Sequence, residues 1–234
     1  FSWALELRIR CGSVSYVVKD IDGMADAYMR GGTFSYGKKL TFLHTPEAFD
    51  EVSVRLLDLI ATTVAYLSDI TSSRSASYDF ARSGFVAERQ LPLSEHDIVY
   101  MLDLLRGRTI SFEPAWSRTT THRSYEVAVE SAPEGEDEAS AKRPPLLAAK
   151  IAPAAGGSYD LRLPADAYCF ASGDVAYLID SHRALRADAA FAQHAAPFLS
   201  RLLPCRTPVH IAAEQVGEFC RMALPVLREY TDLT

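Results

Sequence analysis

The chain has 234 residues, of which 48% are hydrophobic and 23% charged, and its 24 Lys and Arg against 30 Asp and Glu leave a net charge of −6. These proportions exclude a disordered, collagenous or wholly coiled-coil protein. The acidic balance argues against a free-standing nucleic-acid-binding protein but leaves room for a local basic patch. No apolar run approaches the ~18 residues of a membrane helix, so no membrane contact is expected.

The first forty residues predict a strand–strand–helix–strand unit. The alternation of apolar and charged side chains at the start is typical of a half-buried strand, and a Gly-Ser turn then joins it to a second strand rich in β-branched residues. An Asp cap and a Gly pair mark the start and the end of the helix. The expected elements are strands at 3–11, 15–19 and 39–43 and a helix that begins at Asp20 or Asp22 and ends at Gly31-Gly32.

Two long amphipathic helices are expected next. Thr45 and Pro46 suit the cap and the first position of one helix, and Ser94 with Asp97 three residues later has the spacing of a capping box at the start of another. Their apolar residues recur at steps of three or four. These residues are Phe49, Val52, Leu56, Ile60, Val64 and Leu67 in the first helix and Ile98, Met101, Leu102 and Leu105 in the second.

From residue 124 the apolar period changes to two, which is typical of strands. The charged, proline-flanked stretch at 131–144 predicts a mobile surface loop. Strands are expected at 125–129, 146–151, 158–163, 167–171 and 175–180, with a hairpin turn at Gly173-Asp174, and helices at 188–203 and 212–230.

Together these patterns predict an α+β fold of mixed, mainly antiparallel sheets with covering helices, in one continuous domain or in two sub-domains. The expected segments are 1–113 with the first unit and the two long helices, 114–183 with the antiparallel strands and the acidic loop, and 184–234 with the terminal helices.

Residues 32–39, GTFSYGKK, nearly spell the phosphate-binding loop G-x-x-x-x-G-K-[ST]. In that loop a strand runs into a helix, and the final hydroxyl holds Mg²⁺. Here Lys39 replaces the hydroxyl, and the expected order is helix, loop, strand. We therefore interpret the segment as a glycine-rich turn and keep nucleotide binding through Gly32–Lys39 as an alternative.

No spacing in the sequence predicts catalysis or a metal centre. The acidic run 134–138 lacks the pattern of a calcium loop, and neither a nucleophile elbow nor a dinucleotide fingerprint is present. The histidines stand alone and are expected in loops or at helix ends; they are His44, His96, His122, His182, His194 and His210. No catalytic residue, metal ligand or cofactor is therefore predicted for this segment.

Four isolated cysteines, Cys11, Cys169, Cys205 and Cys220, predict reduced and mostly buried thiols, a pattern that favours a cytoplasmic protein. The chain begins with Phe1 rather than Met, and a strand pattern starts within three residues of it. We therefore interpret it as part of a longer polypeptide.

Candidate contacts to nucleic acid or to a partner lie in two places. RTTTHR at 118–123 combines three hydroxyls with two guanidinium groups, although an exposed polar loop also explains it. Residues 1–40 hold six basic and four acidic side chains, a slight bias of +2. The candidate residues are Lys38, Lys39, Arg118, His122 and Arg123.

Three stretches of the chain resemble a known family. LRIRCGSVSYVVKD at 7–20, followed by FSYGKKLTF at 34–42 and by Phe49, looks like the helicase-associated domain of bacterial Swi/Snf-type helicases. FCRMALPVL at 219–227 is similar to that family's later helix, in which an aromatic residue precedes a Leu-Pro pair and another Leu. These are packing motifs and contain no catalytic residue.

The resemblance implies a non-catalytic accessory domain beside the ATPase motor of a DNA translocase, where it positions DNA or a partner or regulates the motor. ATP and Mg²⁺ would serve the motor of the parent protein, with no cofactor in this segment. The expected partners are that motor, in the same polypeptide, and DNA. The alternatives are a nucleotide-binding enzyme and a stand-alone protein-interaction module.

Overall fold

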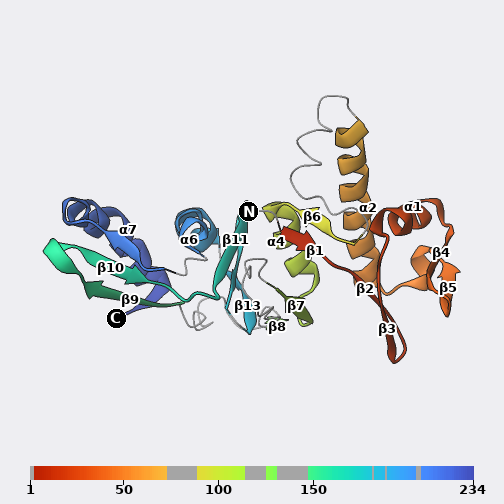
Figure 1. Ribbon diagram of the computed structural model, residues 1–234, viewed down its shortest axis with the longest axis horizontal. Coiled ribbons are helices and arrows are strands. Elements are labelled where there is room, and N and C mark those ends of the chain that lie inside the picture. The colour runs from red at the N-terminus through yellow and green to blue at the C-terminus, as the bar shows by residue number, and fades with distance from the viewer. Residues whose placement is uncertain are drawn as a thin grey trace. The chain divides into compact units, whose positions relative to one another are not determined.

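The computed structural model describes residues 3–72, 89–113, 125–130, 147–180, 182–187, 189–203 and 207–234. The chain divides into two compact units, residues 1–97 (unit 1) and 98–234 (unit 2), and each is described by itself (Figure 1). Both units combine helices with mainly antiparallel sheets, which confirms the predicted α+β fold.

The described residues of unit 1 form three two-stranded antiparallel sheets and two principal helices. The sheets are β1–β6, β2–β3 and β4–β5. The elements are β1 (Trp3–Leu5), β2 (Arg8–Cys11), β3 (Val14–Val17), α1 (Ile21–Arg30), β4 (Thr33–Gly37), β5 (Leu40–Leu43), the 3₁₀ turn η1 (Pro46–Ala48), α2 (Glu51–Ser72), β6 (Leu91–Leu93) and the start of α4 (Glu95–Leu104).

The ends of α1 are fixed by local chemistry. The carboxylate of Asp20 accepts a hydrogen bond from the N–H of Gly23 at 2.7 Å, and Gly31 ends the helix in the left-handed conformation with φ of 59°. A side chain at that backbone conformation is strained, so glycine suits the position. Of the two predicted caps, Asp20 is the one that acts.

Three local predictions for unit 1 were wrong. The expected strand 3–11 is two strands, because β1 pairs with β6 whereas β2 pairs with β3. Residues 33–37 form β4 rather than a loop. The first long helix begins after Asp50, whose carboxylate accepts the N–H groups of Val52 and Ser53, while Pro46 lies in η1.

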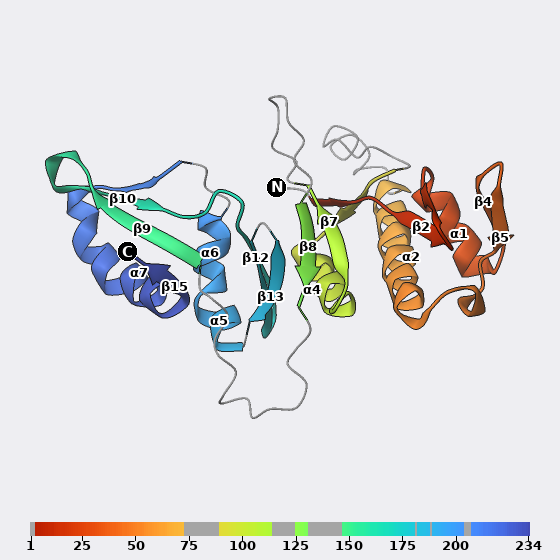
Figure 2. The same ribbon diagram turned by 90° about the horizontal axis from the view of Figure 1, so that it is seen from below.

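The core of unit 1 forms where α1 packs on α2, as both views show (Figures 1 and 2). The predicted stripe of α2 contributes Ile60 and Leu67, which are buried, and α1 contributes Met24. The buried members are Val18, Ile21, Met24, Ala25, Leu57, Ile60, Ala61, Leu67 and Leu91. Unit 1 therefore has an apolar core of its own, which fixes the bases of its hairpins.

Two larger sheets are formed by the residues of unit 2 that the structure describes. One has the strand order β11-β12-β13-β8-β7 and the other β14-β10-β9-β15, and each contains a single parallel pair, β13–β8 and β15–β9. The strands are β7 (Thr109–Phe112), β8 (Tyr125–Val129), β9 (Leu147–Pro153), β10 (Tyr159–Arg162), β11 (Tyr168–Ser172), β12 (Val175–Ile179), β13 (Arg183–Ala187), β14 (Val209–Ile211) and β15 (Thr231–Leu233).

Helices α5 (Ala189–His194), α6 (Ala196–Leu202) and α7 (Val216–Tyr230) enclose one core with both sheets of unit 2. Figure 2 shows α5 and α6 beside β12, and α6 also contacts β11. The predicted helix 188–203 is two helices, because Pro197 lies in the first turn of α6 and has no N–H to continue α5. Short 3₁₀ turns, η2 (Ala155–Gly157) and η3 (Ala213–Gln215), precede β10 and α7.

Helix α4 joins the two units in sequence. Ser94 and Asp97 form the predicted capping box, with hydrogen bonds of 2.7 to 3.1 Å. Further along, Asp103 accepts hydrogen bonds from the hydroxyl of the buried Tyr177 at 2.7 Å and from Nε of Arg186 at 3.2 Å. The predicted segment 1–113 therefore spans the division between the units, because α4 is anchored to β12 and β13.

Candidate nucleic-acid interface

The Gly32–Lys39 segment forms most of a β-hairpin. Lys38 and Lys39 are the two exposed turn residues between β4 and β5, and a register shift lies between Ser35 and Gly37. The order is strand, turn, strand, so the segment does not lead into the helix N-terminus on which the phosphate-binding loop depends. The geometry therefore speaks against nucleotide binding and presents two ammonium groups at the tip of a hairpin.

The β4–β5 hairpin has two unlike faces. Its outer face carries hydroxyls, among which Thr41 donates a hydrogen bond to Ser35 at 2.9 Å. Its inner face carries Phe34 and Phe42, which are cross-strand partners. Hydroxyls beside ammonium groups are common ligands of nucleic-acid phosphates, so the outer face and the turn together suit a polyanion.

The β2–β3 hairpin presents a second group of basic side chains. Arg8 and Arg10 are exposed on its outer face, opposite Val17 and Ser15. Lys19 is also exposed and lies two residues beyond the end of β3. The sequence analysis found only a slight basic bias here, because it counted charges over residues 1–40, where the acidic residues of α1 offset these cations.

The fold separates positive from negative side chains in unit 1. Residues 7–19 and 33–44, which make the two hairpins, contain basic but no acidic residues. The acidic residues between them belong to α1, where Asp20 caps the helix and Asp26 pairs with Arg30 at 2.9 Å. Within the described chain no ion pair engages the hairpin cations, which are Arg8, Arg10, Lys19, Lys38 and Lys39.

A buried histidine fixes the base of the β4–β5 hairpin. His44 is 0% exposed and its ring stacks on Phe42, with centroids 4.4 Å apart. Its Nδ1 lies 3.1 Å from the Phe42 carbonyl, and its Nε2 lies 2.6 Å from the hydroxyl of Tyr36. Since a carbonyl only accepts, Nδ1 carries the proton and the Tyr36 hydroxyl donates to Nε2. His44 follows β5 in a loop, as predicted for the histidines, but its burial was not predicted, and His210 lies in β14 contrary to that prediction.

Burial lowers the pKa of His44 below its ordinary 6.5, and the hydrogen bond to the Phe42 carbonyl opposes this effect only in part. Burial also raises the pKa of Tyr36 far above its usual range, so its hydroxyl keeps its proton. A protonated His44 would need an acceptor at Nε2, where Tyr36 now donates. The neutral ring is therefore the form that the folded hairpin holds.

Acidification is expected to destabilise unit 1 through His44. Because the folded pKa lies below the unfolded one, the unfolded chain takes up the proton first. The stabilisation that the neutral His44 gives to unit 1 is complete above pH 6.5 and is lost as the pH falls toward the lowered pKa of this group. The urea midpoint of unit 1, followed by the NMR signal of the buried Met24 methyl group, should drop between pH 7 and 5.5.

The variant His44→Gln is the control for this pH effect. It should lower the midpoint at every pH and remove the slope in this window. The hydrogen bond from the Thr45 hydroxyl is the main reason that the pKa of Glu47 lies below its ordinary value of 4.5. Glu47 therefore takes up its proton below the pH range of this experiment and does not interfere. An unchanged slope in the variant would contradict the assignment.

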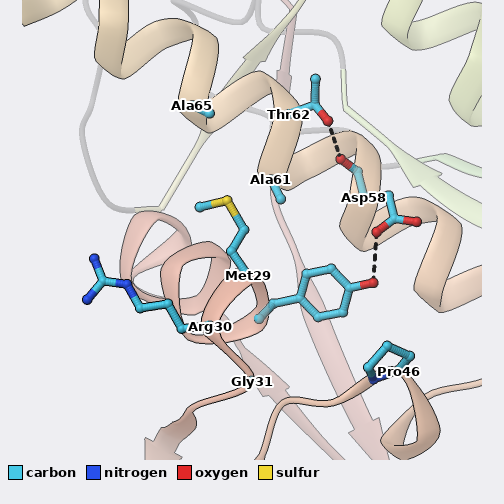
Figure 3. Close-up of a pocket in the computed structure, with 9 residues that line it drawn as sticks. Met29, Arg30, Gly31, Pro46, Asp58, Ala61, Thr62 and Ala65 are labelled. Carbon is cyan, nitrogen blue, oxygen red and sulfur yellow. Dashed lines mark hydrogen bonds between the residues drawn. The ribbon is translucent and has the colours of Figure 1, made fainter.

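A hollow lies between α1 and α2 on unit 1 (Figure 3). The hydroxyl of Tyr28 donates a hydrogen bond to Asp58 at 2.8 Å, and burial together with this bond raises the pKa of Tyr28 to about 12. Met29 is 53% exposed at its rim. The lining residues are Tyr28, Met29, Arg30, Gly31, Pro46, Asp58, Ala61, Thr62 and Ala65. The hollow combines the apolar side chains of Met29, Pro46, Ala61 and Ala65 with the polar groups of Tyr28, Arg30, Asp58 and Thr62.

Several predicted residues lie outside the described part of the chain, namely Arg118, His122 and Arg123, the acidic loop at 131–144, and Cys205. Of the other cysteines, Cys169 is buried, but Cys11 and Cys220 are exposed, contrary to the expectation of buried thiols. In the residues that the structure describes, no three His, Cys, Asp or Glu side chains gather as metal ligands. No helix among them combines the length and the hydropathy needed to cross a membrane.

No family model, curated protein or solved structure matches the chain. The resemblance to the helicase-associated domain therefore depends on the sequence motifs alone.

Proposed function

We propose that the chain is a non-catalytic accessory domain of a bacterial Swi/Snf-type helicase, in which unit 1 holds DNA for the ATPase motor of the same polypeptide. The separation of charge carries the proposal. The charged side chains of both hairpins of unit 1 are all basic, although the whole chain has a net charge of −6. An acidic remainder repels a polyanion and so restricts its contact to the hairpins.

The residues of the family resemblance agree with a packing role. Phe42 contacts both Phe49 and the stacked ring of His44, with ring centroids 5.6 and 4.4 Å away. Leu227, at the end of the later motif, is 0% exposed. The apolar residues of these motifs pack the hairpin base and α7, whereas the five hairpin cations within the same motifs are exposed and available to bind.

Binding by these cations is electrostatic and therefore depends on salt. If each of the five hairpin cations neutralises one phosphate, the slope of log K against log salt is about −4.5. Raising the salt from about 50 to 200 mM should then weaken binding by about 500-fold. Fluorescence anisotropy of the chain with a labelled duplex measures this slope.

The double variant Lys38→Ala/Lys39→Ala tests the site itself. It should weaken DNA binding at low salt and make the slope shallower by about 2, since two phosphate contacts are removed. The control Arg221→Ala/Arg228→Ala removes two exposed cations of α7 and should leave affinity and slope unchanged. Absence of binding at low salt, or equal losses in both variants, would refute the proposed DNA contact.

Regulation of the motor through a protein contact is a second candidate role. The hollow between α1 and α2 favours it, because it combines an exposed Met29 with the small side chains of Ala61 and Ala65. A chain that binds the isolated motor but no DNA would support this role instead.

A further inference from the structure

We propose that the β2–β3 hairpin enters the major groove of double-stranded DNA, where Arg8 and Arg10 face base edges and Val17 packs on thymine methyl groups. This inference rests on the DNA contact proposed above and adds the groove and the residues that contact bases.

The dimensions of the hairpin suit that groove. Paired strands lie about 4.8 Å apart, and a two-stranded ribbon with its side chains enters the B-form major groove, which is about 12 Å wide. The minor groove is about 6 Å wide, and the major groove of A-form RNA is too narrow. Among the described strands, β2 and β3 pair only with each other. Figure 1 shows their turn at a free end of unit 1.

The outer face of the hairpin carries the groups that read bases. Arg8 and Arg10 lie two residues apart, so their Cα atoms are about 7 Å apart along the strand. Opposite them stand Val17 and Ser15, with Cβ atoms about 5 Å away across the strands. A guanidinium group donates to O6 and N7 of guanine, and an apolar side chain contacts the C5-methyl of thymine. One face therefore holds donors and methyl groups side by side.

Val17 distinguishes a groove contact from a purely phosphate contact. It is 40% exposed, it is not a member of the core of unit 1, and its cross-strand partner is Arg8. Isolated exposed valines are common on surfaces, but here the valine stands in a row of polar side chains that faces the ligand. The methyl groups of Val17 would not contribute to a contact with phosphate, but in the major groove they can pack on the methyl group of thymine.

The same face argues for a duplex over a single strand. Proteins that bind single strands stack the bases on exposed aromatic rings. The aromatic ring of this hairpin, Tyr16, is half-buried and pairs with Ile9 on the opposite face. Stacking on the basic face is therefore not available to a single strand.

Chemical changes in the DNA test the proposal with the protein left intact. Anisotropy at low salt compares one duplex in three forms: unmodified, with uracil for thymine, and with 7-deazaguanine for guanine. Loss of the thymine methyl groups or of the guanine N7 acceptors should weaken binding, by about 5-fold or more for the guanine change. The uracil effect should disappear in Val17→Ser, which has no methyl group to contact thymine.

Two further variants separate base contacts from phosphate contacts. Arg8→Lys/Arg10→Lys keeps the charges but loses the planar fork, so it should reduce the 7-deazaguanine effect and keep the salt slope. Lys38→Ala should weaken binding to all three duplexes equally. Should Val17→Ser not fold, the modified duplexes decide the question with the unmodified protein.

The results that would refute the groove contact differ from those that would refute the DNA contact itself. Equal affinity for the three duplexes, or equally tight binding of single strands or double-stranded RNA, would overturn the groove contact and leave the DNA contact standing. No binding of any nucleic acid at low salt would overturn both.

Discussion

Reversal of four hairpin charges is expected to abolish DNA binding. The variant Arg8→Glu/Arg10→Glu/Lys38→Glu/Lys39→Glu replaces four phosphate contacts by four repulsions, so its affinity at low salt should fall by about 1,000-fold or more. All four side chains are exposed and make no ion pair within the described chain. The far-UV circular dichroism of the variant should therefore stay unchanged.

A matched variant separates the effect of where the charges lie from the effect of the total charge. Lys150→Glu/Arg162→Glu/Arg221→Glu/Arg228→Glu reverses four exposed cations of unit 2 and changes the net charge by the same amount. If the hairpins make the contact, this variant keeps most of its affinity. Equal losses in both variants would show that only the overall charge matters and would contradict the assignment to unit 1.

Truncation of Leu227 is expected to loosen the packing of α7 and β15 on the core of unit 2. Leu227 is 0% exposed on α7 and belongs to the same core as Leu161 and Leu199. Leu227→Ala should cost about 3 kcal/mol, because it removes apolar contacts and leaves a cavity. The loss spreads to β15, since the hydroxyl of Thr231 donates to the Leu227 carbonyl and β15 begins at that residue.

Hydrogen exchange measures this loss locally. The amide of Ile151 donates to the Thr234 carbonyl and that of Thr234 to the Ala149 carbonyl, both at 2.9 Å. Their exchange should accelerate by about 100-fold in the variant. Leu224→Ala, one turn earlier on the same helix and only half-buried, should change it little. Similar acceleration in both variants would contradict the docking of α7 through Leu227.

Elements that depend on neighbouring residues could be predicted from the sequence. The Asp20 cap and the Gly31 end of α1 act through contacts within a few residues, and so do the capping box at Ser94 and the Gly173-Asp174 turn. The apolar stripe of α2 follows from the helical period alone. These features need no distant partner, which is why a pattern in the chain identifies them.

Strand partners could not be predicted in this way. Residues 3–11 read as one alternating strand, yet β1 pairs with β6 some ninety residues later and only β2 joins the hairpin. The segments of β7 and β13 were missed for the same reason, since their pairing with β8 comes from the packing of unit 2. Alternation shows that a strand is half-buried but not which strand lies beside it.

The candidate site shows the same limit. Lys38 and Lys39 were singled out because they adjoin a glycine motif. Arg8 and Arg10 were not, because the acidic residues in 1–40 leave that stretch with a net charge of only +2. His44 was placed among loop residues, because only the packing of Phe42, Tyr36 and Phe49 makes it the buried base of a hairpin.

The sequence by itself determined the α+β class, the caps and turns and most helices, because each of these depends on spacing within a few residues. The tertiary structure alone decided the strand order, the division within α4, and the form in which the basic segments are presented. The acidic residues at 20–26 already stand between two basic segments in the sequence, but only the pairing of β2 with β3 and of β4 with β5 places those cations on exposed hairpins, because a hairpin requires the chain to fold back on itself.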